Sequence, residues 1–177
     1  FVKDVFLDSD TDLIVLSFVP STRKGEPLTI EEAGATARIV EKMQGTHRMF
    51  IHGRVNPNQA GDLEGMDELQ QKWGVSAWKT YTQYGPNGEG YFLYDDVGIR
   101  FIEKARALGV KNICIHKGLP FGRRSYEHSQ CSDIGVVAKR FPDVNFLVYH
   151  SGFVTGVREQ PYDPAANTLE DKIGVAT

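Results

Sequence analysis

The stretch Asn112–Gly152, NICIHKGLPFGRRSYEHSQCSDIGVVAKRFPDVNFLVYHSG, contains two predicted strands and the helix that joins them. Its beginning, Asn112–Leu119, and its end, Asn145–Ser151, are mostly apolar runs of the kind found in strands that are buried on both faces. Between them, Ser129–Arg140 has apolar residues at helical spacing, and Pro142 blocks its continuation. The stretch therefore predicts one β–α–β unit with parallel strands.

The same alternation of strand-like and helix-like segments extends through the rest of the chain. Further strands are expected at Asp12–Val19, Arg48–Val55 and Val75–Tyr81. Helices are expected after Thr29, which has Glu32 in capping-box position, up to Gly45, and from Asp62 to Trp73, where Gly74 ends the helix. Another helix is expected from Asp95 to Leu108, and a short one from Thr168. Such alternation is typical of α/β proteins with a parallel sheet. Right-handed crossovers are compatible with a barrel or with an open sheet that has helices on both faces, and the pattern alone does not separate the two.

The composition is that of one globular domain, with 177 residues of which 41% are hydrophobic and 24% charged. The formal net charge of −3, with acids and bases interspersed, argues against a nucleic-acid partner. No apolar stretch approaches the roughly 20 residues that span a bilayer, so no membrane association is expected. The two cysteines indicate the reducing cytoplasm. Because the first residue is Phe1, the chain could be processed or cut from a longer gene product.

Four consecutive predicted strands end in a comparable way, with the sequences FIHGR, AWKTY, CIHKG and VYHSG. Each places a side chain that can bind a metal or transfer a proton near its carboxyl end: His52, Lys79, His116 and His150. Sites in parallel α/β proteins are built at that end of the sheet, and adjacent strands lie about 4.8 Å apart. We therefore expect these four side chains to converge on one pocket.

The chemistry of these residue types favours a metal-assisted enzyme. Imidazole suits zinc and neighbouring divalent metals, and a catalytic zinc takes three protein ligands and activates a water molecule. A further histidine can act as general acid/base. His116 and His150 alone are too few ligands for a complete site. Lys79 has three possible roles: a cation for a substrate carboxylate, a carbamylated bridge between metals, or a surface lysine with a buried stem.

Several of these segments together resemble a known family. The runs NICIHKGLPFG, SDIGVVAKRFPDVNFLVYHSGF, FLDSDTDLIVLSFVPS and IHGRVNPN, between Val5 and Gly156, resemble metal-dependent amidohydrolases. The most similar branch includes aminocarboxymuconate-semialdehyde decarboxylase. The resemblance implies a distorted (β/α)8 barrel in which the five predicted strands are the second to the sixth. It places a metal-binding histidine at His116 and the catalytic histidine at His150. His52 as a second metal-binding residue and Lys79 as a catalytic residue are predicted from position alone.

The chain also departs from the family's pattern. It contains no H-x-H to serve as the first-strand metal ligands, and no eighth strand with its ligand Asp. Since a full barrel usually needs about 250 residues, residues 1–177 are predicted to form a single, incomplete barrel domain. Its first and last strands would have exposed edges, which a second copy or another chain could cover.

The resemblance thus implies a metal-dependent hydrolase or decarboxylase acting on a small substrate, with a carboxylated one among the options. The expected cofactor is a divalent metal, zinc first, with manganese or another metal as the alternative. His116→Ala in the complete protein should then abolish metal retention and turnover together. The alternative function is that of a catalytically incomplete fragment with a structural or binding role. A third option is an open doubly wound sheet that binds a phosphate or flavin, although the first βα turn lacks the glycine pattern for it.

Overall fold

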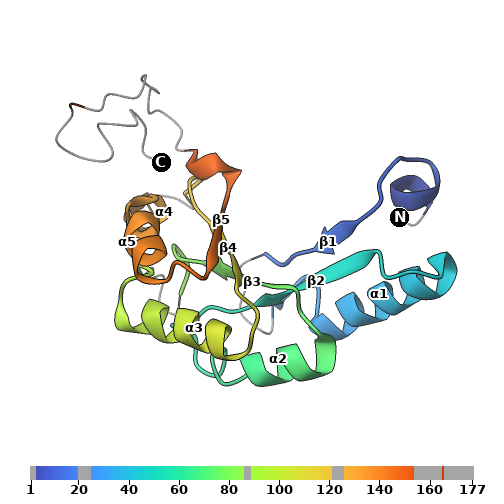
Figure 1. The fold of residues 1–177 in the computed structure, drawn as a ribbon, viewed down its shortest axis with the longest axis horizontal. Helices are drawn as coiled ribbons and strands as arrows, with labels where there is room; N and C mark the ends of the chain where they lie inside the picture. The colour runs from blue at the N-terminus through green and yellow to red at the C-terminus, as the bar shows by residue number, and fades with distance from the viewer. Residues whose placement is uncertain (1–2, 20–24, 86–88, 121–125, 154–164, 166–177) are drawn as a thin grey trace.

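The computed structural model describes residues 3–19, 25–85, 89–120, 126–153 and 165. Within these residues, five strands form one parallel sheet whose order in space is the order in the chain (Figure 1): β1 (Ile14–Leu16), β2 (Met49–Arg54), β3 (Ala77–Tyr81), β4 (Asn112–His116) and β5 (Asn145–Tyr149). The predicted parallel α/β architecture is therefore confirmed.

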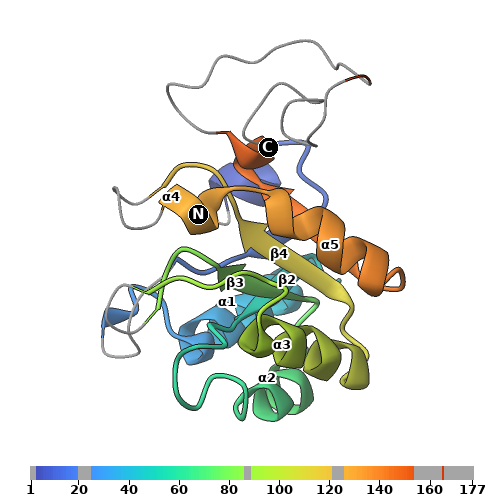
Figure 2. The ribbon, with the colours of Figure 1, turned by 90° about the vertical axis from the view of Figure 1, so that its left-hand side faces the viewer.

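The helices α1 (Ile30–Gln44), α2 (Met66–Trp73), α3 (Asp96–Ala107) and α5 (Ser132–Arg140) lie on one side of this sheet. The short helix α4 (Tyr126–Ser129) precedes α5, a short π-helix, η1 (Lys3–Leu7), precedes β1, and a 3-10 turn, η5 (His150–Gly152), follows β5. Because each right-handed crossover steps to the next strand in the same direction, successive helices fall on the same face. Figures 1 and 2 show α1, α2, α3 and α5 following the outside of the curved sheet. The fold is a partial (β/α) barrel, and the open doubly wound sheet is excluded.

Local signals set the ends of several elements as predicted. At the start of α1, the Thr29 side chain accepts a hydrogen bond from the Glu32 amide at 3.2 Å, and the Thr29 amide donates to the Glu32 carboxylate at 2.9 Å. This is the predicted capping box. Gly45 ends α1 in a left-handed conformation with φ of 70°, and Gly74 ends α2 with φ of 59°.

Other boundaries differ from the prediction. The predicted helix start at Asp62 is wrong: α2 begins at Met66, because the Asp62 carboxylate accepts from the Asn56 amide at 2.9 Å and residues 57–65 form turns. The helix predicted from Ser129 begins at Ser132 instead, after the separate turn α4. Strand β1 has three residues because only β2 pairs with it among the described strands. A helix predicted at Thr168 lies outside the described residues.

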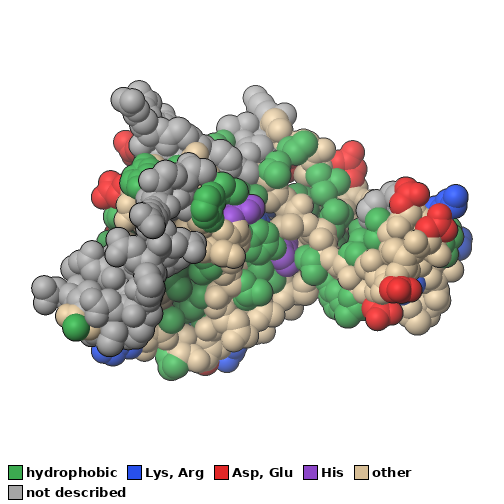
Figure 3. Space-filling model, turned by 90° about the horizontal axis from the view of Figure 1, so that it is seen from above, with side chains coloured by type: hydrophobic (Ala, Val, Ile, Leu, Met, Phe, Trp, Pro, Cys, Tyr) green, Lys and Arg blue, Asp and Glu red, His purple; other side chains and the backbone are tan. Residues whose placement is uncertain are grey.

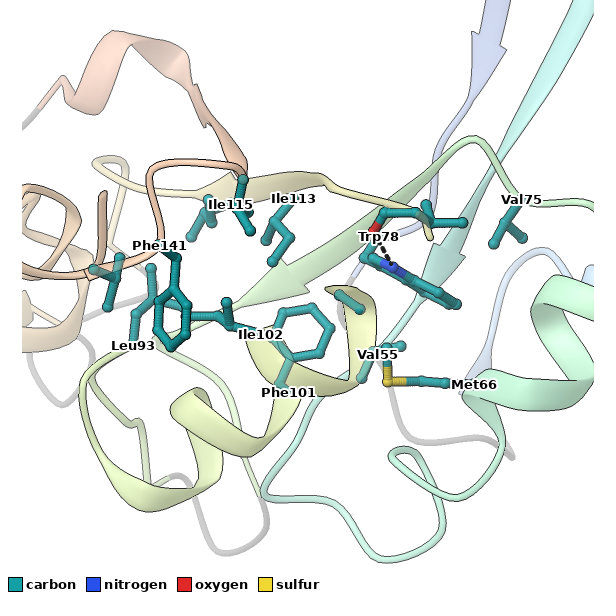
Figure 4. Close-up of a cluster of buried hydrophobic side chains, with 14 of the residues drawn as sticks. Val55, Met66, Val75, Trp78, Leu93, Phe101, Ile102, Ile113, Ile115 and Phe141 are labelled. Carbon is teal, nitrogen blue, oxygen red and sulfur yellow. Dashed lines mark hydrogen bonds between the residues drawn. The ribbon is translucent and has the colours of Figure 1, made fainter. Parts of the chain in front are cut away.

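The hydrophobic core lies between the outer face of the sheet and the helices. Trp78 and Ile113 are register partners on β3 and β4, and they pack with Phe101 and Ile102 of α3 (Figure 4). All four are fully buried, and burying an aliphatic or aromatic side chain of this size stabilises a fold by roughly 1.5–3 kcal/mol. The Trp78 indole also donates to the Val110 carbonyl at 2.9 Å. This core fixes which side chains of each strand face outward.

The alternate side chains of the same strands occupy the inner face. Lys79 pairs in register with Cys114, and Tyr81 pairs with His116, which itself pairs with Tyr149 on β5. Since successive strand residues point to opposite faces, these residues point away from the Trp78 core. Figure 3, which shows the molecule from above, has histidine side chains visible among hydrophobic ones. The inner face therefore holds the residues that can do chemistry. A search of the described residues finds no helix that could span a lipid bilayer.

Candidate active site

His116 and His150 lie in direct contact. His116 is the last residue of β4, and His150 follows the last residue of the neighbouring strand β5. The Nε2 atom of His150 is 3.1 Å from the Nδ1 atom of His116, and the ring centroids are 4.4 Å apart. Both are at the carboxyl ends of parallel strands, where barrel enzymes build their active sites. The structure thus brings together the two residues that the resemblance singled out.

The backbone at His150 is in a conformation that L-residues rarely adopt. His150 has φ of 57° and Ser151 has φ of 51°, and Gly152 continues the left-handed turn with φ of 65°. A non-glycine residue in this region costs of the order of 1–2 kcal/mol. Such strain is found at functional sites, where the surrounding structure holds it in place. Here it ends β5 and sets His150 against His116.

The ring of His116 is held by two more neighbours. Its Nε2 atom is 3.4 Å from the Leu119 carbonyl oxygen, and the Tyr81 ring stacks on it with centroids 5.0 Å apart. The Tyr81 hydroxyl is fixed in turn by donating to the Phe18 carbonyl at 2.6 Å. Burial lowers the pKa of His116 to about 4, and the charges of His150 and Lys79 act in the same direction. His116 is therefore a neutral imidazole near pH 7.

Lys79 is a buried amine, with only 1% of the residue exposed. Its Nζ lies 3.4 Å from the centroid of the Tyr149 ring and 4.6 Å from that of Tyr81. The Nζ atom has no hydrogen-bond partner among the described residues. Burial lowers the pKa of Lys79 to about 7, although the neighbouring Cys114 thiol acts in the opposite direction. The surface alternative for Lys79 is therefore excluded.

His52 lies in a deeper layer of the inner face. It pairs in register with Ala77, whereas His116 pairs with Tyr81, four residues further along β3 and so roughly 13 Å closer to the carboxyl end. The His52 Nδ1 is 3.1 Å from the Ser17 hydroxyl, and its Nε2 is 3.9 Å from the Cys114 thiol. Burial, helped by the charge of Lys79, lowers the pKa of His52 to about 4. The sequence predicts that His52 and His116 lie equally close to the carboxyl ends of the strands, whereas the strand register places His52 further from these ends.

Four neighbours of the predicted residues were not predicted from the sequence: Ser17, Tyr81, Cys114 and Tyr149. Cys114 and Tyr81 each lie two residues from a predicted one, and so on the same face of their strand. Cys114 is almost fully buried, and its thiol contacts His52. A count along each strand in steps of two would have found Cys114 and Tyr81, whereas Ser17 and Tyr149 are identified only by the contacts in the structure.

The donor atoms of the described residues do not by themselves fit a metal centre. Both ring nitrogens of His116 contact other groups, and so do both ring nitrogens of His52. Across residues 3–153, apart from the gaps in the description, no three His, Cys, Asp or Glu side chains form a group that could hold a metal ion. A catalytic zinc takes about three such ligands. Metal binding by His116 and His52 stays a prediction.

A cavity of about 350 Å³ lies near the ends of α1 and α2. Arg54 at its wall binds the carboxylates of Glu26 and Asp62, so its charge is already neutralised within the protein. Trp73 and Leu69 supply apolar surface. Its described lining residues do not include the four predicted site residues. The cavity is therefore separate from the contact between His116 and His150.

Comparison with protein-family models matches residues 3–169, nearly the whole chain, to the amidohydrolase family. Comparisons with curated proteins and with solved structures give no match.

Proposed function

The chain belongs to the amidohydrolase family, and from this premise we propose that it is a hydrolase or decarboxylase in which His150, held against His116, transfers the proton. One observation carries the proposal. The two imidazoles are 3.1 Å apart at the carboxyl ends of neighbouring parallel strands, the edge at which barrel enzymes bind their substrates. The described donor atoms do not complete a metal centre, so the proposal concerns only what these side chains do.

His150 is the proposed general acid/base. Its role is to give a proton to the leaving nitrogen or oxygen in a hydrolysis, or to the carbon that loses its carboxylate in a decarboxylation. Its neighbour His116 is neutral near pH 7, since burial lowers the pKa of that ring to about 4. A neutral imidazole in contact with His150 can accept a hydrogen bond from it, and this bond stabilises the form of His150 that carries the donated proton. General acid/base catalysis of this kind contributes typically 10²–10⁴-fold to the rate.

Lys79 supports a carboxylated substrate. A buried ammonium without a hydrogen-bond partner gains most from an anion, because an isolated charge is costly in an apolar environment. The Tyr81 ring contacts both Lys79 and His116, so a substrate carboxylate at Lys79 would have its reactive end near the histidines. A lysine for the carboxylate beside the two histidines agrees with a decarboxylase. We therefore include in the proposal that the chain belongs to the branch that includes aminocarboxymuconate-semialdehyde decarboxylase.

The test replaces the proposed acid/base and leaves its surroundings in place. His150→Asn should lower kcat at least about 100-fold, measured as release of CO2, amine or alcohol from a panel of small carboxylated amides, esters and unsaturated acids. His47→Asn is the matched control, because His47 is exposed and precedes the amino end of β2, the end of the strand opposite to the candidate site. Circular dichroism should show both variants folded. An active His150→Asn enzyme would sink the proposal.

A second candidate function is a structural or binding role in which a second copy of the chain completes the barrel. It is favoured by the inner-face residues Val15 on β1 and Leu147 on β5, which are 51% and 44% exposed. Both are apolar, and both lie on edge strands of the described sheet. Pairing of two copies would bury this surface.

A further inference from the structure

We infer that Gly118 and Leu119 are positioning residues: their turn holds His116 in the tautomer that makes Nδ1 of His150 the atom that exchanges a proton with the substrate. The inference rests on the proposed function and names the reacting atom within it. Three observations carry it: the partner of each ring nitrogen, the bonds between the two turns, and the space at Gly118.

The tautomer follows from the partners of the His116 ring. Its Nε2 atom faces the Leu119 carbonyl oxygen at 3.4 Å, and a carbonyl oxygen can only accept a hydrogen bond. The single proton of the neutral ring is therefore on Nε2, and Nδ1 is an acceptor. The atom 3.1 Å from Nδ1 is Nε2 of His150, which must then be the donor. His150 keeps its Nε2 proton in this contact, so the nitrogen left to exchange a proton is Nδ1.

The Leu119 carbonyl is held in place by bonds between two turns. The Leu119 amide donates to the Phe153 carbonyl at 2.8 Å, and the Phe153 amide donates to the His150 carbonyl at 2.9 Å. The turn after β4 is thus bonded to the turn after β5. Each of these turns carries one of the two histidines at its start. A shift of the first turn would move the Leu119 oxygen away from His116 and would also move the backbone of His150.

Only a glycine allows the two turns to approach this closely. Gly118 has φ of 64°, and a Cβ atom there would lie 2.3 Å from the Phe153 carbonyl oxygen and 2.5 Å from the Phe153 nitrogen. Both atoms belong to the backbone, so a side chain at position 118 forces the turns apart. The residue before the turn is fixed as well, since the buried Lys117 ammonium is 2.8 Å from the Asp133 carboxylate. Strain from an added side chain therefore falls on the Leu119 side of the turn.

The chain offers a matched control for this substitution. Gly109 also has a positive φ, 76°, but a Cβ atom at Gly109 would meet nothing within 4 Å. Gly118→Ala and Gly109→Ala therefore carry a similar backbone penalty for a side chain at positive φ, and only the first forces the two turns apart. The difference between the two variants in the His116 tautomer and in kcat therefore measures the effect of moving the Leu119 carbonyl.

The experiment is nitrogen NMR of the full chain labelled with ¹⁵N-histidine, together with kinetics. In the wild type, His116 should carry its proton on Nε2 and show an unprotonated Nδ1, a result that needs no variant. In Gly118→Ala, the His116 signals should shift toward a mixture of tautomers, and kcat should fall at least about tenfold with KM within about twofold. Gly109→Ala should retain the wild-type tautomer and kcat.

Two results would overturn the inference. A wild-type His116 with its proton on Nδ1 contradicts the tautomer assignment, whatever the activity. A Gly118→Ala protein with the wild-type spectrum and kcat contradicts the positioning role. If instead the tautomer is as expected but His150→Asn retains full activity, the proposed function fails, and the proton-exchange role of the His150 Nδ1 fails with it. The spectrum and the turnover of His150→Asn thus separate the two failures.

Discussion

The chemistry available to His116 and His150 is decided by their neighbours. The two histidines could be singled out from the sequence because each ends an apolar run and is followed by a small or polar turn. The Leu119 carbonyl oxygen that faces His116 could not be singled out from the sequence. Every residue carries a carbonyl group, and only the conformation of the turn decides which one faces the ring. The side-chain type thus indicates what a residue can do, and its contacts determine which atom does it.

Lys79 provides a test at the residue scale. Since burial lowers its pKa in the folded state to about 7, the unfolded chain binds a proton at this lysine between pH 7 and 10.5 that the folded chain does not. The free energy of unfolding should therefore rise by roughly 2 kcal/mol from pH 7 to pH 9. The contribution is complete above pH 10.5 and is lost as the pH falls to about 7. Urea unfolding at both pH values measures it.

Lys79→Met removes the titrating amine and keeps the length of the side chain. This variant should lack most of the rise between pH 7 and pH 9, and it should be more stable than the wild type at pH 7. Lys72→Met is the control, because Lys72 is exposed on α2, where it pairs with Glu68. An equal rise in Lys79→Met and the wild type would show that Lys79 is not the group that titrates.

At the scale of elements, local sequence signals set the helix ends, and the strand ends depend on neighbours. Helix α1 begins at its capping box and ends at Gly45 because both signals act within one turn of backbone. Strand β1 is shorter than its apolar run, since only β2 pairs with it among the described strands. Helix α2 starts late because Asp62 bonds to Asn56 and Arg54. Contacts made outside an element therefore move its boundaries.

The capping box of α1 gives a prediction at this scale. Thr29→Ala removes the side chain that accepts from the Glu32 amide, so the free energy of unfolding should fall by about 1 kcal/mol. Thermal and urea unfolding measure the change. Thr46→Ala, at an exposed position after the same helix, should change stability by less than about 0.5 kcal/mol. Equal losses in the two variants would contradict a capping role for Thr29.

At the scale of the whole molecule, the outer and inner faces of the sheet differ in how well they are covered. Helices bury the outer face, where Trp78 and Ile113 are fully buried. On the inner face, Val15 and Leu147 remain half exposed. Apolar surface of this kind is commonly covered by another part of a protein or by a partner. The inner face is also where His116 and His150 lie, so what covers it would also enclose the candidate site.

Sedimentation of the chain over a range of concentrations tests the second candidate function. If a second copy covers the inner face, the wild type should sediment above the mass of one chain, and a Val15→Ser, Leu147→Ser double variant should return to that mass. The control is the pair Ile39→Ser and Val136→Ser, since both residues are more than half exposed on the helices α1 and α5. A wild type that stays at the mass of one chain would rule out the second copy.

The alternation of strands and helices, the cap of α1 and the glycines that end α1 and α2 could be determined from the sequence alone, because each depends on residues within a few positions of one another. The tertiary structure decided the barrel over the open sheet, since the order of strands is a relation between distant segments. It also decided the level of His52, the burial of Lys79 and the contact between His116 and His150. These depend on strand register, which joins residues more than 20 positions apart and is set by the packing of the core.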